Sequence, residues 1–333
     1  MVRIWLNHWF STAYHIILLL KRDNPDFQVI GSNENEYSPI MTVCDEWYRE
    51  PSLKEGEYVE FCLQFCREHR IDIFMPRRGA LAISKNIRRF TEAGVKVMVE
   101  DYATMQALNH KDQAYALFRE KGIGIVPEHC IVRTAEQFKE GYSRLSACYQ
   151  RVCFKFVHDE GGKSYRLIDN DRKGYKALFR KLTTRMTFDD AVKALSQREE
   201  FPPIMMMPYL PDEEVSVDCL RTETGLIAIP RVKDSTRIEK IRYDRQILDF
   251  CRDLHNKVLL EHPCNIQFKY LDGVPYILEV NTRMSGGVQM ACAASGINIP
   301  SIAANQLLGI QKPWEDRRVE CAVCHVEYPV VLL

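Results

Sequence analysis

Strands and helices alternate along the first hundred residues, and this alternation limits the fold more than any other feature of the sequence. Apolar runs of strand length occur at residues 2–6, 28–30, 71–75 and 95–99. Helical patterns end near residue 20 and cover residues 57–69 and 80–93. This order predicts a parallel sheet whose ligand-facing loops follow the carboxyl ends of the strands.

Composition and charge are typical of a soluble globular protein. The 333 residues are 46% hydrophobic, and 45 basic residues balance 45 acidic ones, which argues against a broad nucleic-acid or membrane-surface footprint. No apolar run approaches the roughly 18–20 residues of a membrane span. The run at 16–20 is too short for a signal peptide and lacks a cleavage site. The twelve cysteines lie mostly in apolar patterns, which favours reduced thiols. We expect a cytoplasmic protein without nucleic-acid or membrane partners.

Beyond residue 103 strands and helices no longer alternate regularly. Strands are predicted at residues 152–157, 165–168, 204–210, 214–220 and 226–232. Helices are predicted from 109 to 122, from 175 to 198 and from 249 to 260. The highly charged stretch 235–245 is interpreted as a mobile loop, and residues 319–328 as a terminal strand.

The most informative stretch lies near the end of the chain. Two apolar runs, 265–269 and 277–280, are separated by a segment that contains Asp272-Gly273. Because Asp-Gly is a typical dipeptide of tight turns between antiparallel strands, this segment predicts a β-hairpin.

The hairpin carries a set of oxygen-bearing side chains. Glu279 and Asn281 are two residues apart, so both side chains leave the same face of the second strand. Gln267, on the first strand, is expected to lie opposite them. One carboxylate and two amide oxygens form the kind of site that Mg²⁺ prefers, usually together with phosphates. Arg283 follows on the same side, where it can neutralise phosphate charge.

Lys155 lies in an apolar strand directly before a glycine-rich loop. Its side chain leaves the face opposite Phe154 and Phe156. Alone, such a charge favours a solvent-exposed face over a bound anion by about two to one. The loop with Gly161-Gly162 and Ser164 shifts the interpretation towards an anion, because glycines let backbone N–H groups close over phosphates.

In this order the motifs resemble the ATP-grasp superfamily, and the Gln…Glu-x-Asn-x-Arg pattern looks most like its carbamoyl-phosphate-synthetase-related branch. Residues 5–14 are also similar to the ATP-grasp proteins associated with bacterial tellurite-resistance clusters. The resemblance implies an α/β fold with α+β character in the C-terminal part. It implies a Rossmann-like pre-ATP-grasp domain at 1–105, a small subdomain with a linker helix at 106–210, and a large metal-binding subdomain at 211–333.

The resemblance also implies which residues bind ATP. They are Lys111, Lys155, Gly161, Gly162, Ser164, Met207, Tyr209, Leu210, Glu214, Arg231 and Lys233. The lysines and the glycine loop would hold phosphates, the backbone near Tyr209 the adenine, and Glu214 the ribose. The chain departs from the family by having Met207 or Pro208 where a Glu often begins the hinge, so no hinge acid is assigned. Methionine clusters are more often core, and Arg231 and Lys233 fit a solvated strand edge equally well.

The implied metal is Mg²⁺, as two ions for which Mn²⁺ can substitute. Gln267, Glu279 and Asn281 would be its ligands. Arg283 and Lys155 would be catalytic, because they offset negative charge that develops during phosphoryl transfer.

Two loops at the carboxyl ends of predicted strands are candidates for substrate binding. The candidate residues are Asn7, Phe10, Ser11, Thr12, Arg77 and Arg78. Two arginines at the start of a helix would suit an anionic group of the substrate. Simple solvation of surface arginines is the alternative.

One motif points elsewhere. Cys321-x-x-Cys324-His325 spells a covalent haem-attachment sequence, but no export signal accompanies it. A zinc site would need a second pair of ligands, for which Cys62 and Cys66 with His69 are available. The spacing of those cysteines fits the buried face of a helix better, and the role of the C-terminal motif stays open.

The function implied by the resemblance is an ATP-dependent carboxylate ligase. A small-molecule carboxylate would be phosphorylated to an acyl phosphate, and a nucleophile, such as an amine, would displace the phosphate. A kinase-like phosphotransferase and a non-catalytic nucleotide-binding protein are the alternatives. The identities of the acid and the nucleophile are not encoded in these motifs, and a homodimer is compatible with the resemblance.

Overall fold

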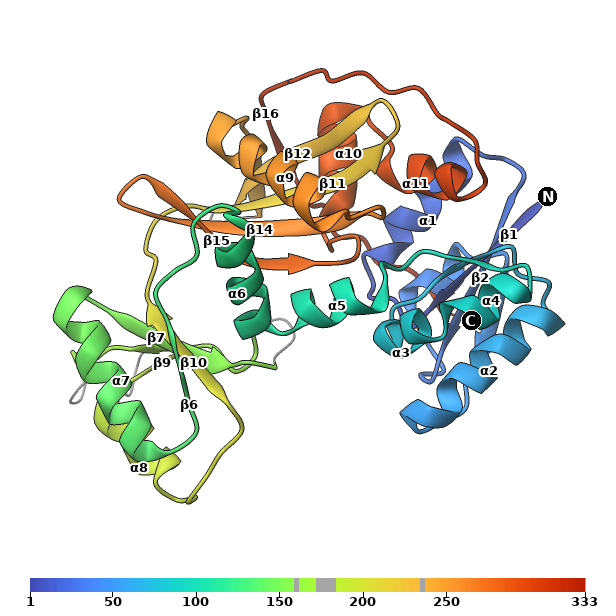
Figure 1. Cartoon of the computed structure of the whole chain (residues 1–333). Helices are drawn as coiled ribbons and strands as arrows, with labels where there is room; N and C mark the ends of the chain where they lie inside the picture. The colour runs from blue at the N-terminus through green and yellow to red at the C-terminus, as the bar shows by residue number, and fades with distance from the viewer. Residues whose placement is uncertain (159–161, 172–183, 234–236, 333) are drawn as a thin grey trace. The chain divides into compact units, whose positions relative to one another are not determined.

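The computed structural model describes residues 1–158, 162–171, 184–233 and 237–332, arranged in two compact units (Figure 1). The first unit comprises Met1–Gln106, Glu213–Gln267 and Val280–Leu333, and the second comprises Ala107–Asp212 and Phe268–Glu279. The three domains predicted at 1–105, 106–210 and 211–333 stay a prediction. Gly161 and part of the predicted helix 175–198 lie outside the described residues.

The first unit begins with a parallel five-stranded sheet, as the alternation of strands and helices predicts. Its strands are β1 (Val2–Asn7), β2 (Phe27–Asn33), β3 (Glu46–Arg49), β4 (Ile73–Met75) and β5 (Lys96–Val97), in the order β3-β2-β1-β4-β5. All four neighbouring pairs are parallel. A short 3₁₀ helix, η1 (Pro39–Thr42), precedes β3. The sequence analysis missed β3 because its residues, Glu-Trp-Tyr-Arg, form no apolar run.

Helices cover both faces of this sheet. Helix α1 (Ala13–Arg22) packs on the side of Ile4 and Leu6. Trp5, which points the other way, packs against the face covered by α2 (Glu55–Glu68), α3 (Ala80–Lys85) and α4 (Ile87–Glu92) (Figure 1). The predicted single helix at 80–93 is wrong, because Asn86 leaves the helical conformation and separates α3 from α4.

Two C-terminal helices complete the core around α1. They are α10 (Val288–Ser295) and α11 (Ile299–Leu307), and both contribute to the same hydrophobic cluster as α1 and β1. A buried polar network reinforces this contact. Asn24 donates to Ser301 Oγ at 2.8 Å and accepts from the side-chain amide of Asn305 at 2.8 Å.

A second sheet carries the predicted hairpin. Its strands are β11 (Glu214–Thr222), β12 (Gly225–Lys233), β13 (Ile238–Ile241), β14 (Cys264–Leu271), β15 (Val274–Asn281) and β16 (Cys321–Cys324), in the order β15-β14-β11-β12-β13-β16. The hairpin β14–β15 is confirmed: Asp272 and Gly273 both have positive φ, 51° and 77°, as a two-residue turn requires. Helix α9 (Arg245–Val258) precedes β14. The loop predicted at 235–245 is wrong in part, because β13 lies within it.

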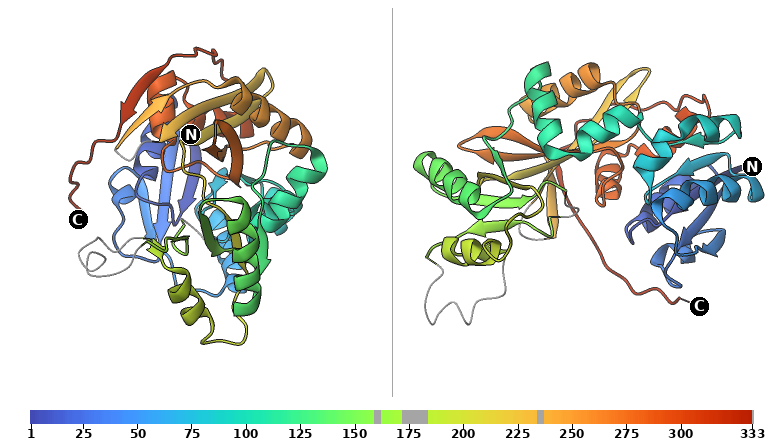
Figure 2. Two further views of the ribbon diagram at one scale, coloured as in Figure 1. Left: turned by 90° about the vertical axis from the view of Figure 1, so that its left-hand side faces the viewer. Right: turned by 60° about the horizontal axis from the view of Figure 1, so that its bottom comes forward.

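The second unit contains a sheet with the order β6-β10-β7-β8-β9. Its strands are β6 (Cys130–Val132), β7 (Val152–Phe156), β8 (Arg166–Ile168), β9 (Arg185–Met186) and β10 (Ile204–Pro208). Helices α7 (Ala135–Cys148) and α8 (Phe188–Leu195) lie together on one face (Figure 2). Tyr142 and Phe188 stack there with ring centroids 4.3 Å apart. Helix α5 (Tyr102–Asn109) leads into α6 (Lys111–Lys121).

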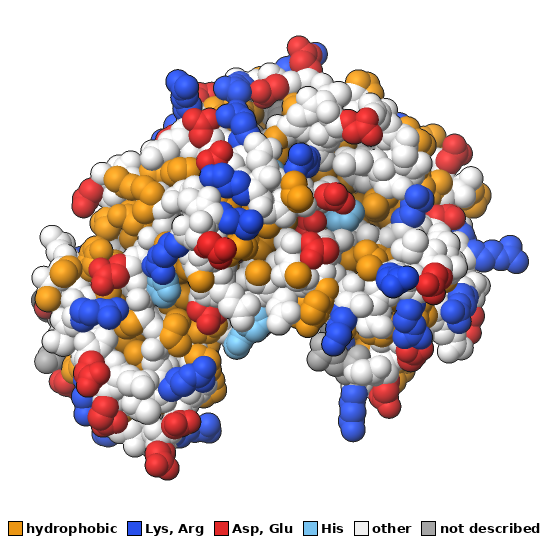
Figure 3. All heavy atoms as spheres, viewed as in Figure 1, with side chains coloured by type: hydrophobic (Ala, Val, Ile, Leu, Met, Phe, Trp, Pro, Cys, Tyr) orange, Lys and Arg blue, Asp and Glu red, His pale blue; other side chains and the backbone are white. Residues whose placement is uncertain are grey.

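The distribution of charged side chains and the apolar character of the helices agree with the composition. Basic and acidic side chains are interspersed over the face drawn in Figure 3. Among the described residues, no helix combines the length and the apolar character that crossing a bilayer requires. The described part of the chain includes all twelve cysteines, and every one of them is a free thiol.

Candidate functional site

The three predicted metal ligands lie on the β14–β15 hairpin. Gln267, Glu279 and Asn281 are half-buried, whereas the neighbouring Phe268 and Val280 are buried. Gln267 and Asn281 belong to the first unit, and Glu279, near the end of β15, belongs to the second. Because Glu279 and Asn281 are two apart on one strand, their side chains leave the same face.

Helix α6 holds the strand that carries Glu279. The ammonium of Lys111, the first residue of α6, lies 3.6 Å from Glu279 Oε2, so two predicted site residues meet here. One turn later the Tyr115 hydroxyl donates to the carbonyl oxygen of Leu278 at 2.9 Å. Burial, and secondarily the charge of Glu279, raise the pKa of Tyr115, so this hydroxyl keeps its proton.

Lys155 lies on the face of its sheet that α7 and α8 leave uncovered. Lys155 is paired with Met205 and Cys153 with Met207 across β7 and β10, so these four side chains share a face. Phe154 points the opposite way, into the core beneath α7 and α8, as the sequence predicts. Burial raises the pKa of Cys153 to about 11, although the charge of Lys155 opposes this rise.

The remaining candidates of the second unit lie at the ends of strands. Gly162 has a φ of 66°, which glycine adopts readily. The Ser164 hydroxyl accepts the backbone N–H of Phe156 at 2.9 Å and closes the loop onto β7. Tyr209 is half-buried and Leu210 is buried directly after β10.

In the first unit, Glu214 and Lys233 are cross-strand partners. They lie opposite each other on β11 and β12, and Lys233 Nζ is 2.6 Å from Glu214 Oε1. About one third of each side chain is exposed, 30% for Glu214 and 34% for Lys233. Glu214 and Lys233, which are predicted to contact the ribose and a phosphate of ATP, therefore form an ion pair with each other in this structure.

Arg231 differs from its predicted surroundings, because only 2% of it is exposed. Its Nε donates to Asp218 Oδ2 at 2.8 Å, it forms a second ion pair with Glu239, and it donates to Ser285 Oγ at 3.0 Å. Burial works to lower the pKa of Arg231, but the two carboxylates outweigh it and the net shift is upward. Two carboxylates flank this guanidinium, so Arg231 does not lie on the solvated strand edge that the sequence also allowed.

The loop beside Arg231 offers a matched pair of glycine substitutions. A methyl group at Gly287 would lie 2.4–2.8 Å from the guanidinium of Arg231, which its carboxylate partners hold in place. Gly287→Ala is therefore expected to lower the free energy of unfolding by about 1–3 kcal/mol. Gly286→Ala is the control, because its methyl group would approach Thr12 Oγ1 no closer than 3.4 Å. Chemical denaturation of both variants checks the difference, and equal stability would contradict the fixed position of Arg231.

Asn7 fixes the predicted substrate loops rather than facing solvent. It is fully buried, and its side chain accepts the N–H of Arg77 at 2.6 Å. It also donates to the Tyr58 hydroxyl at 2.7 Å and to the carbonyl oxygen of Arg78 at 3.1 Å. The two loops that the sequence proposes for substrate are thereby held together.

A polar cluster that the sequence analysis missed lies next to Asn7. His8 Nε2 is 2.8 Å from the carboxylate of Glu50, which is buried and also accepts the hydroxyl groups of Ser32 at 2.6 Å and Tyr58 at 2.8 Å. Arg78 lies 3.7 Å from the same carboxylate and forms another ion pair with Glu34. The position of His8 just after β1 was the available signal, because this edge of a parallel sheet gathers ligand-binding loops.

The loop after β1 also meets the loop after β15. The Arg283 guanidinium lies over the ring of Phe10, 5.8 Å from its centroid. Thr12 precedes α1, and its hydroxyl oxygen is buried without a hydrogen-bond partner among the described residues. Predicted substrate residues and the predicted catalytic arginine therefore lie together within the first unit.

The cysteines of both motifs lie in regular secondary structure. Cys62 and Cys66 lie on the buried face of α2, as their helical spacing predicts. Cys321 and Cys324 belong to β16, and His325 lies 3.4 Å from the side-chain amide of Gln289.

The chain is similar to several known proteins. Residues 200–328 match the model of a family described as ATP-grasp in the biosynthetic pathway with Ter operon. The arginine-specific carbamoyl phosphate synthase large chain of Geobacillus stearothermophilus is 21% identical over 316 residues, and that of Bacillus subtilis is 20% identical over 315. Each match covers 90% of this chain but only 28% of the relative, so this chain spans little more than a quarter of their length.

Solved structures show the same fold. The biotin carboxylase domain of Hydrogenobacter thermophilus 2-oxoglutarate carboxylase, bound to ADP, magnesium and bicarbonate, superimposes with a TM-score of 0.70 at 15% identity. That match covers 95% of this chain and 72% of the other. An L-amino acid ligase from Bacillus licheniformis gives 0.64 at 13% identity, with 92% and 74% covered.

Proposed function

Because this chain belongs to the ATP-grasp superfamily, on the branch related to carbamoyl phosphate synthase, we propose that it is an ATP-dependent, ADP-forming ligase acting on a small carboxylic acid. An oxygen of the carboxylate attacks the γ-phosphorus, the bond to the β–γ bridging oxygen breaks, and ADP leaves. A nucleophile, for which we propose an amine, then attacks the acyl carbon and inorganic phosphate departs.

The observation that carries this proposal is the meeting of the loops at Phe10–Thr12 and Arg283–Gly287. Arg283 contacts Phe10 in the first of these loops. If the phosphoryl group is transferred next to this loop, the Arg283 guanidinium offsets the negative charge that develops on it. The Thr12 hydroxyl is a buried donor without a partner among the described residues, and it stands at the positive end of helix α1. A substrate carboxylate would satisfy both the hydroxyl and the helix end.

The residues of the hairpin fit Mg²⁺. Gln267, Glu279 and Asn281 offer hard oxygen atoms on half-buried side chains, the ligand type that Mg²⁺ takes in proteins. When bound there, Mg²⁺ would neutralise charge on the β- and γ-phosphates of ATP. Lys111 forms an ion pair with the carboxylate of Glu279 and so holds it in place, and Lys155 supplies a second positive charge for the phosphates.

The test is ADP release by the purified protein with Mg²⁺ and ATP across a panel of carboxylic and amino acids, with hydroxylamine as a trap. Acid-dependent ADP release together with a hydroxamate is expected, because hydroxylamine attacks an acyl phosphate. Acid-dependent ADP without hydroxamate would indicate a phosphotransferase instead. If no acid in the panel stimulates ADP release, the result would favour a protein that binds nucleotide without catalysing a reaction.

Thr12→Val tests where the acid binds. The substitution keeps the shape of the side chain but removes the hydroxyl, so we expect the KM for the acid to rise about 10–100-fold, as for a lost hydrogen bond to a charged group. The KM for ATP should stay the same. Steady-state kinetics with either substrate varied checks this, and Thr91→Val, on the exposed surface of α4, is the matched control. An unchanged KM for the acid would place the carboxylate elsewhere.

The assembly proposed is a homodimer, since the biotin carboxylase domain of the Hydrogenobacter enzyme is described as a dimer. Light scattering of the purified protein measures the mass of the assembly.

A further inference from the structure

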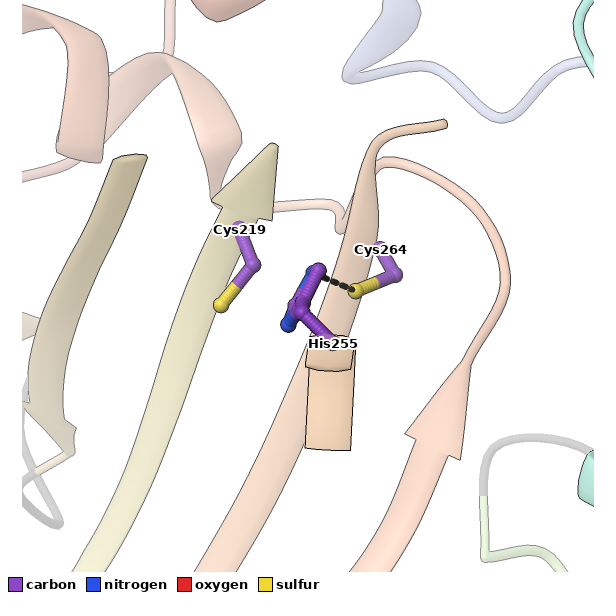
Figure 4. Close-up of side chains that lie close together, drawn as sticks. All are labelled: Cys219, His255 and Cys264. Carbon is purple, nitrogen blue, oxygen red and sulfur yellow. Dashed lines mark hydrogen bonds between the residues drawn. The ribbon is translucent and has the colours of Figure 1, made fainter. Parts of the chain in front are cut away.

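Three side chains of metal-ligand type meet inside the first unit, and none of them belongs to the proposed ATP site. They are Cys219 on β11, His255 on α9 and Cys264 on β14 (Figure 4). One ligand atom from each residue lies within 4.8 Å of the other two. All three residues are at most 2% exposed. A cluster of two thiols and an imidazole, shielded from water and drawn from three elements, is therefore preformed in the fold.

The orientation of His255 is that of a metal ligand. Its Nδ1 lies 2.8 Å from the carbonyl oxygen of Cys251, which can only accept a hydrogen bond, so Nδ1 carries the proton. The lone pair is then on Nε2, which faces Cys264 Sγ at 3.6 Å. Metal-binding histidines are held in this way, with the other ring nitrogen donating to a backbone carbonyl or a carboxylate.

The spacing also suits a tetrahedral ion. Zinc bonds of about 2.3 Å to sulfur and about 2.0 Å to nitrogen place neighbouring sulfur and nitrogen ligands about 3.5 Å apart. The 3.6 Å between Cys264 Sγ and His255 Nε2 is close to this value. A thiol that only hydrogen-bonds to an imidazole would have a similar distance, but it would not require the second sulfur of Cys219 within the same 4.8 Å.

We propose that Cys219, His255 and Cys264 bind a structural Zn²⁺ ion that ties helix α9 to strands β11 and β14. The two thiols release their protons to solvent as the metal enters. Two thiolates and a neutral imidazole then cancel the charge of the buried dication, and sulfur with nitrogen is a ligand set that favours zinc over magnesium. Cys251, one helical turn before His255, lies beside Cys219, but its sulfur is outside the group of ligand atoms that lie within 4.8 Å of one another.

Metal analysis of the whole chain tests this proposal. Protein purified under reducing conditions without chelators should contain about one zinc ion per chain. Exchange of zinc for Co²⁺ should produce the near-ultraviolet charge-transfer band of a cobalt–thiolate bond and intense visible bands of a tetrahedral site. The proposed ATP-site metal has only oxygen ligands, so it cannot produce the thiolate band, and the two sites are told apart by spectrum alone.

Two alanine variants complete the test. Cys264→Ala should lose the zinc and the cobalt–thiolate band, whereas Cys292→Ala should keep both. Cys292 is a matched control because it is a buried cysteine of the same unit outside the cluster. Zinc retained by Cys264→Ala would overturn the proposal. If that variant does not fold, the unmodified protein decides: absence of both zinc and a cobalt–thiolate band would equally overturn it, whatever the ligase assay shows.

Discussion

Glutamine in place of Glu279 is expected to lower acid-dependent ADP release at least about a thousandfold, the range seen when charge stabilisation of a transition state is removed. The carboxylate is the one charged oxygen donor among the three proposed Mg²⁺ ligands, and the ammonium of Lys111 lies 3.6 Å from it. Neutralising it would weaken metal binding and leave the Lys111 charge without this partner. Coupled-enzyme measurement of ADP over a range of Mg²⁺ concentrations checks the result.

A loss of activity through misfolding has to be separated from a loss of metal. Glu279 is half-buried, and the glutamine side chain has nearly the same volume, so the unfolding temperature is expected to change little. Glu136→Gln, on the exposed surface of α7, is the matched control and should keep full activity. Retention of more than a tenth of the turnover by the Glu279 variant at low Mg²⁺ would remove Glu279 from the metal site.

Arg231→Met is expected to lower the free energy of unfolding by about 3–5 kcal/mol. The substitution fills much of the same space but leaves Asp218 and Glu239 without the cation that compensates them. Asp218 is 1% exposed, so water cannot replace the lost partner in the folded state. Urea denaturation followed by circular dichroism measures the change.

An exposed ion pair provides the comparison. Arg89→Met removes the partner of Glu60 on the surface of the same unit, and it should leave the unfolding transition where it is, because exposed pairs contribute little. Similar transitions for the Arg231 and Arg89 variants would mean that the buried carboxylates become neutral or reach solvent. In that case the position of the loop that contains Ser285 would not depend on its hydrogen bond to Arg231.

Local chemistry made parts of this fold predictable. The turn at Asp272-Gly273 follows from the ability of both residues to adopt positive φ, and the parallel sheet follows from alternating strands and helices. The apolar runs on either side of this turn predicted the hairpin, and the spacing of Glu279 and Asn281 put both side chains on one face of its second strand. Strand β3 escaped prediction because a strand at the edge of the sheet needs no apolar run.

Features that depend on distant partners could not be predicted in the same way. The sequence shows Arg231 as a charge in a strand, and its burial becomes reasonable only once Asp218 and Glu239 are known to lie beside it. The pairing of Lys111 with Glu279 likewise joins segments far apart in the chain. Cys219, His255 and Cys264 carry no spacing motif, whereas the Cys-x-x-Cys-His sequence that does carry one belongs to a terminal strand.

The hydrogen bonds that join Asn24 to Ser301 and Asn305 have a consequence for the order of events on the ribosome. Helix α1 emerges from the ribosome well before α10 and α11, yet one face of α1 is completed only by these two helices. Until then Asn24 and the apolar side chains around it stay exposed to water and to chaperones. A fragment that stops after residue 105 should therefore be recovered as aggregate or in complex with a chaperone, although its five strands are all present.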